Sequence, residues 1–302
     1  MAGRANSHKA IFFALGANFA IFIAKGAAAW LTGSGAMLAE SVHSLADCCN
    51  QLLLLVGLRS AQGPASPEHP LGSGKAIYFW SFLVALLLFS VGGLFSIWEG
   101  WHKLVTPEPL TRPWIAVGVL IFGICAEGVS MRACLREIAK FRNQRGLWKW
   151  FRESRSSELI VIFGEDLAAL LGLLFALAAI GLTIWTANPL FDALGTLAIG
   201  VLLVLVAFFV AVEIKSLLIG QGVDPEVKEA MLAFLGARPE IRRVFNLITL
   251  QLGQDVMVAV KAEMARGQSA DSLIADINAV ERDLKRNFPQ IRWSFFEPDV
   301  ED

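Results

Sequence analysis

A stripe of ionisable and polar side chains is the first indication of chemistry in this 302-residue sequence. Within segment 39–51 such residues recur every three or four positions: Glu40, His43, Asp47 and Asn50. A helix places residues at this spacing on one face. A neutral imidazole one turn from a carboxylate suits a divalent transition metal. The alternative interpretation is a polar pair that hydrogen-bonds a neighbouring helix.

Further ionisable residues lie inside other apolar segments, where a charged side chain normally faces a cavity, an ion or a partner. Asp166 is a candidate metal ligand, whereas Glu165 fits either a ligand or the acceptor of an interhelical hydrogen bond. Glu127 could line an ion path or relay protons, and pairing with a polar group such as Asn18 is the alternative. For Lys25 we expect the amine to extend to the membrane interface.

The composition indicates a membrane protein, because 55% of the residues are hydrophobic and only 18% are charged. The formal net charge is −1, and no basic patch interleaved with aromatic residues indicates nucleic-acid binding. No nucleophile–base constellation or phosphate-binding loop suggests an enzyme. The sequence therefore points to a membrane protein that needs no cofactor.

Six apolar segments are each long enough to cross a bilayer, which takes about 20 helical residues. They begin near Ile11, Gly35, Ala76, Trp114, Ser157 and Pro189. The loop expected between the fourth and fifth carries eight Lys and Arg residues from Arg132 to Arg155, whereas the tight turns 32–35 and 187–189 carry none. This bias and the even number of spans place both termini in the cytoplasm. It also puts four tryptophans at the outer surface: Trp30, Trp101, Trp114 and Trp185.

After about residue 220 the pattern changes to short alternating elements. Asp224-Pro225 is a helix start, and strands are predicted over 243–250 and 255–263, joined by a turn at 252–254. A second helix and a last strand over 291–296 give the order αββαβ, typical of a small α+β domain of the split-βαβ kind. We therefore predict a membrane domain over 1–219 and a cytoplasmic domain over 220–302. The second contains no His or Cys, which excludes metal sites built from those ligands.

Several runs together resemble the cation diffusion facilitator family of divalent-metal transporters. They are Ser-Val-His-Ser-Leu-Ala-Asp at 41–47, His-Pro-Leu-Gly-Ser-Gly-Lys at 69–75, Phe-Asp-Ala-Leu-Gly at 191–195 and the tail from Leu217. Asn50-Gln51 and Glu165-Asp166 are most similar to the branch of mitochondrial-type zinc transporters and their bacterial relatives. The resemblance implies an all-α six-helix transmembrane bundle, a ferredoxin-like cytoplasmic domain that dimerises, and exchange of metal for protons.

The resemblance also implies a transport site of four residues, two from the second span and two from the fifth. His43 and Asp47 occupy the first pair of positions, and Asp166 occupies one position of the second pair. The remaining position is Ile162, which cannot bind a metal. The chain departs from the family pattern there.

The missing ligand has several possible replacements. Glu165 is the nearest, although an adjacent residue points about 100° away on a regular helix. Gly164 could loosen the turn enough to bring Glu165 round. Otherwise Glu40, Asn50 or a water completes the coordination shell.

These expectations define a homodimeric integral protein of a bacterial inner membrane that exports a divalent metal ion, most simply Zn²⁺, in exchange for protons. Metal ligands must be deprotonated, so binding and proton release are linked, and His43 titrates in the physiological range. The ligand set also suits Mn²⁺, Co²⁺ or Fe²⁺, and a non-transporting sensor or scaffold of the same fold is a second hypothesis. His69 indicates either a second ion site or a structural role in its loop.

Overall fold

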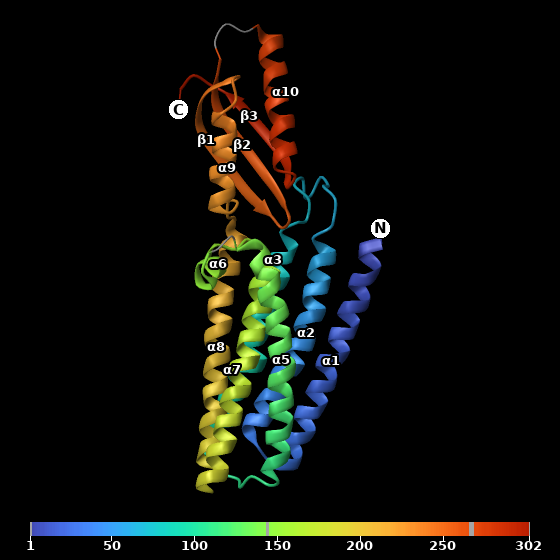
Figure 1. The fold of residues 1–302 in the computed structure, drawn as a ribbon, viewed down its shortest axis with the longest axis vertical. Coiled ribbons are helices and arrows are strands. Elements are labelled where there is room, and N and C mark those ends of the chain that lie inside the picture. The colour runs from blue at the N-terminus through green and yellow to red at the C-terminus, as the bar shows by residue number, and fades with distance from the viewer. Residues whose placement is uncertain (1, 143–144, 266–268, 302) are drawn as a thin grey trace. The chain divides into compact units, whose positions relative to one another are not determined.

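Long helices make up most of the chain (Figure 1). The computed structural model describes residues 2–142, 145–265 and 269–301. The chain divides into two units. The first comprises the chain up to Val56, Trp80–Arg145 and Glu158–Glu213, and the second comprises Gly57–Phe79, Gly146–Ser157 and the chain from Ile214.

The first unit is a bundle of helices. They are α1 (Ala2–Thr32), α2 (Gly35–Ser60), α3 (Ala76–Leu87), the π-helix η1 (Leu88–Leu94), α4 (Phe95–Val105), α5 (Pro113–Phe141), α7 (Ser157–Thr186) and α8 (Leu190–Ile219). Five helical runs in the described residues are long and apolar enough to cross a membrane: α2, α3–η1–α4, α5, α7 and α8. Five of the six predicted spans therefore coincide with helices of sufficient length and apolar composition. In α1 the apolar helix identified is the shorter stretch Asn18–Thr32, so its crossing of the membrane stays a prediction.

The segment between the fourth and fifth predicted spans is more helical than expected. Arg132, Arg136 and Lys140 belong to α5, which continues to Phe141, and a further helix, α6 (Leu147–Glu153), follows. Trp150 and Phe151 of α6 are buried. The expectation of a plain loop is therefore wrong, because these buried aromatic side chains provide α6 with a packing face that charge counting does not reveal.

Close packing between the α3–η1–α4 run and α8 depends on glycine. A Cβ atom added at Gly100 would lie 2.8 Å from the backbone nitrogen of Leu197, and one at Gly200 would lie 2.7 Å from the backbone nitrogen of Ile97. The sequence predicts a membrane span that begins near Ala76, and in the structure this run contains a π-helical stretch at Leu88–Leu94. Such stretches are rare and occur preferentially at functional sites.

The second unit contains a three-stranded sheet with the order β1-β2-β3. Its elements are α9 (Pro225–Gly236), β1 (Ile241–Leu252), β2 (Asp255–Met264), α10 (Ala270–Asn287) and β3 (Ile291–Pro298). β1 pairs antiparallel with β2, and β2 pairs parallel with β3 through the α10 crossover. The predicted order αββαβ is confirmed. Alternate residues of β2 are buried and pack against both helices, as its sequence alternation indicates.

The loop before α3 and the first turn of α3 contact the β1–β2 turn within the second unit. The backbone N–H of Gly253 donates to the Tyr78 hydroxyl at 2.9 Å. Gly253 has a φ of +68°, which favours glycine. A Cβ atom at Gly74 would overlap the carbonyl oxygen of Leu252, so only glycine fits between loop and turn.

Gly74→Ala should therefore separate the loop from the turn. We expect faster amide hydrogen exchange at residues 252–254 and a loss of about 1–3 kcal/mol of stability, because the methyl group meets backbone rather than a movable side chain. Gly236→Ala is the matched control, since an added Cβ there meets nothing within 4 Å. Unchanged exchange at residues 252–254 in Gly74→Ala would contradict this description of the contact.

Candidate metal site

The polar stripe of α2 faces the interior of the helix bundle. Glu40, His43 and Asn50 are buried, whereas Cys49 is exposed. Nε2 of His43 lies 3.8 Å from Oδ2 of Asp47, one turn later. Neither ring nitrogen of His43 has a hydrogen-bond partner among the described residues. Buried polar groups are nearly always hydrogen-bonded, so this imidazole is a candidate ligand whose partner is not part of the protein.

α7 contributes two acids to the bundle interior. Glu165 and Asp166 are each only 9% exposed, whereas Ile162 is 37% exposed. Ile162 therefore lies at the bundle surface. Because its side chain cannot bind a metal, the candidate ligands on α7 are the two buried acids. The suggested loosening at Gly164 is wrong, because α7 is regular there. Gly164 instead permits close packing, since an added Cβ would lie 2.7 Å from Val210 of α8.

Electrostatic interactions connect the polar groups of α2, α5 and α7. Glu165 interacts with Asp47 and with the Asn50 side chain, so α2 and α7 are close at this level. Glu127 of α5 interacts with His43 and Asp47. The hydroxyl of Ser130, a residue the sequence does not single out, donates to Oδ1 of Asp166 at 3.1 Å.

Unpartnered buried atoms are concentrated at this level of the bundle. In the described part of the first unit, every buried side-chain polar atom without a hydrogen bond belongs to α2 or α7. The residues are Glu40, His43, Asp47, Asn50, Gln51, Glu165 and Asp166. Within the described ranges, no three His, Cys, Asp or Glu side chains are close enough together to hold one ion. Common coordination by these residues stays a prediction, and it requires the acids of α7 to approach the His43–Asp47 pair.

Lys25 does not extend to the membrane interface, so that expectation is wrong. Its side chain is fully buried, and Nζ lies 3.0 Å from Oε2 of Glu40 and 2.9 Å from Oγ of Ser44. The physical reason is a carboxylate on the neighbouring helix that compensates the buried ammonium. Glu40 therefore has a basic side chain as its partner inside the bundle.

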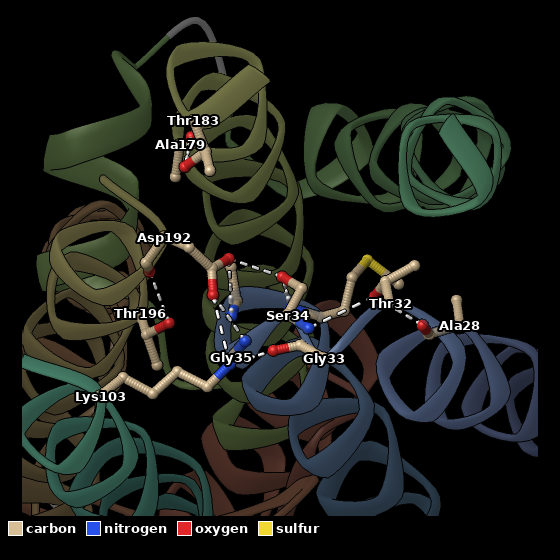
Figure 2. A network of polar contacts seen from close by, with 12 residues as sticks. Ala28, Thr32, Gly33, Ser34, Gly35, Lys103, Ala179, Thr183, Asp192 and Thr196 are labelled. Carbon is tan, nitrogen blue, oxygen red and sulfur yellow. Dashed lines mark hydrogen bonds and ion pairs between the residues drawn. The ribbon is translucent and has the colours of Figure 1, made fainter. Parts of the chain in front are cut away.

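A second polar network fixes the start of α2 (Figure 2). Asp192 of α8 accepts hydrogen bonds from the Ser34 hydroxyl at 2.6 Å and from the backbone N–H of Gly35 at 2.7 Å. Nζ of Lys103 lies 3.5 Å from the same carboxylate and donates to the carbonyl of Gly33. A carboxylate at a helix N-terminus satisfies free N–H groups and the helix dipole. Asp192 thus fixes the helix that carries His43.

His69 lies outside this site. Its side chain is exposed, and its carbonyl accepts from the backbone N–H groups of Ser66 and Gly72. These contacts support the structural role in the loop.

Comparison with known proteins gives matches over most of the chain. A family model described as the cation efflux transmembrane domain matches residues 11–219. The mitochondrial proton-coupled zinc antiporter SLC30A9 of Homo sapiens is 33% identical over 239 residues, which cover 78% of this chain and 42% of the antiporter. Metal tolerance protein C4 of Arabidopsis thaliana is 32% identical, over 76% of this chain and 51% of that protein. The cation-efflux pump FieF of Klebsiella pneumoniae is 28% identical, over 89% and 85%. The chain spans less than half the length of the zinc antiporters that it matches.

Asp192→Asn should loosen the start of α2. The amide keeps the side-chain size but removes the charge that pairs with Lys103, and its NH₂ group cannot accept from backbone N–H donors. We expect a loss of about 2 kcal/mol of stability, measured by thermal unfolding in detergent. Thr183→Val is the control, since the Thr183 hydroxyl donates to the carbonyl of Ala179 within its own helix. Equal stability of the two variants would show that Asp192 does not hold α2.

Proposed function

Because the chain belongs to the cation diffusion facilitator family of cation-efflux transporters, we propose that it moves Zn²⁺ out of the cytoplasm in exchange for protons. The observation that carries the proposal is the buried imidazole of His43, which lacks a hydrogen-bond partner in the described structure beside the carboxylate of Asp47. Relatives named as a zinc antiporter and a cation-efflux pump support the direction and the substrate class.

The proposed ligands are His43 and Asp47 of α2 with Glu165 and Asp166 of α7. One nitrogen and three carboxylate oxygens give the four ligands that Zn²⁺ usually takes in proteins. Each of these groups binds metal only in its deprotonated form, so an arriving ion displaces protons and returning protons displace the ion. That competition is the chemical basis of an antiporter.

Two further residues fit an ion path or proton relay around this site. Glu127 of α5 interacts electrostatically with His43 and Asp47. The buried side chain of Asn50 lies one turn beyond Asp47 and interacts with Glu165. In our proposal six transmembrane helices, including α1, rock to expose the site to each side of the membrane in turn.

The order αββαβ supports a ferredoxin-like cytoplasmic domain that joins two protomers. The Lys- and Arg-rich segment between α5 and α7 supports a location of both termini in the cytoplasm. Trp30, Trp101, Trp114 and Trp185 are all exposed, as an interfacial belt requires. A bacterial inner membrane is the proposed location, supported by the match to FieF.

Removal of either α2 ligand should abolish most transport. In proteoliposomes with a pH gradient and a Zn²⁺ indicator inside, we expect His43→Ala and Asp47→Ala each to reduce flux at least about tenfold, because a lost ligand weakens the ion-bound state. Cys49→Ala is the control, since that thiol is exposed on the other face of α2. Transport by both ligand variants at the rate of Cys49→Ala would refute the site.

A second comparison tests which residue replaces the ligand missing at Ile162. Glu165→Gln keeps the size of the side chain and removes its charge, so we expect at least about tenfold weaker Zn²⁺ binding. Ile162→Val should bind Zn²⁺ as the unaltered protein does, because Ile162 lies at the bundle surface. Isothermal titration of the purified protein measures both. If Ile162→Val bound Zn²⁺ more weakly and Glu165→Gln did not, Glu165 would not be a ligand and the proposed binding face of α7 would be wrong.

A further inference from the structure

Lys25 is a fully buried cation beside the proposed metal site. Its exposed fraction is 0%, as is that of Glu40. Nζ contacts Oε2 of Glu40 at 3.0 Å and Oγ of Ser44 at 2.9 Å. Because Ser44 follows His43 directly and Glu40 lies one turn before it, the ammonium is held against the helix that carries the candidate ligands.

The surrounding helices leave room for this ion pair. A Cβ atom at Gly172 of α7 would overlap Oε1 of Glu40, so the carboxylate occupies space that a side chain there would fill. Oε1 of Glu40 is buried and has no hydrogen bond in the described structure. Burial of an ion pair seldom adds net stability, so a contribution to stability does not explain why Lys25 and Glu40 are buried here.

The charge of Lys25 reaches the neighbouring titratable groups. Lys25 interacts electrostatically with His43, Asp47 and Glu127. A fixed positive charge at this position repels a second cation bound at the same site. The carboxylate that Lys25 engages is also the one that could otherwise serve as an additional ligand on the stripe of His43.

We propose that Lys25 is the internal counter-cation of the transport site: it holds Glu40 out of the ion's coordination shell and weakens ion binding so that release is fast. This inference rests on the proposed Zn²⁺ transport. The role is one of positioning and electrostatics, because an ammonium group has no lone pair with which to bind a cation. With no ion bound, its charge offsets part of the negative charge of the acids around it.

The test is Zn²⁺ affinity of the purified full chain, measured by competition with a fluorescent chelator. Lys25→Met removes the charge at similar length and should tighten Zn²⁺ binding about tenfold, because repulsion is lost and Glu40 is freed. Glu40→Gln leaves Lys25 unbalanced and should weaken binding about tenfold. The double variant Lys25→Met/Glu40→Gln should lose the tightening seen in Lys25→Met. Ile23→Met is the control for substitution in α1, since Ile23 is 53% exposed.

The outcomes separate this inference from the transport proposal. If His43→Ala abolishes Zn²⁺ binding while Lys25→Met binds as tightly as Ile23→Met, the role of Lys25 is overturned and the site stands. If His43→Ala binds Zn²⁺ normally, the site itself fails. If Lys25→Met does not fold, the test uses Glu40→Gln alone. Zn²⁺ binding by Glu40→Gln that is unchanged or tighter would contradict the role proposed for Lys25.

Discussion

Ionisable side chains can be buried among apolar helices only when something compensates them, and this constraint divides the polar groups of the bundle into two kinds. Some have protein partners: Lys25 pairs with Glu40, and Asp192 pairs with Lys103 and the start of α2. Others, foremost His43, have buried atoms without a hydrogen bond in the described structure. The first kind holds helices in place. The second kind is available to a ligand, and it is concentrated on α2 and α7.

The scaffold positions these available groups through contacts at several levels. Asp192 fixes the first turn of α2 two turns before His43. Close approach at Gly100 and Gly200 joins α4 to α8, and Gly92 of the π-helix η1 lies beside His43, since an added Cβ there would be 3.9 Å from Nδ1. Such π-helical stretches occur frequently at functional sites, and η1 lies next to the imidazole.

Sequence reasoning succeeded where a pattern is local and failed where a contact depends on tertiary packing. The apolar spans and the order αββαβ follow from periodicity, length and turn residues. The partner of Lys25 lies 15 positions away on another helix, so its burial cannot be read from the apolar run around it. The same holds for Asp192, whose partners at the start of α2 lie more than 150 positions earlier, and for the aromatic packing of α6. The sequence alone shows that Ile162 cannot bind metal, but only the bundle shows that it faces outward while both Glu165 and Asp166 are buried.

The central claim is that one imidazole and acidic oxygens from α2 and α7 bind a single ion inside the bundle. X-ray absorption at the zinc edge of the Zn²⁺-loaded protein tests it most directly, because imidazole, carboxylate and thiolate ligands differ in bond length and scattering. We predict one imidazole nitrogen with oxygens in the remaining positions, and loss of the imidazole signal in His43→Ala. A sulfur ligand, or a first shell of oxygens alone in the unaltered protein, would contradict the account.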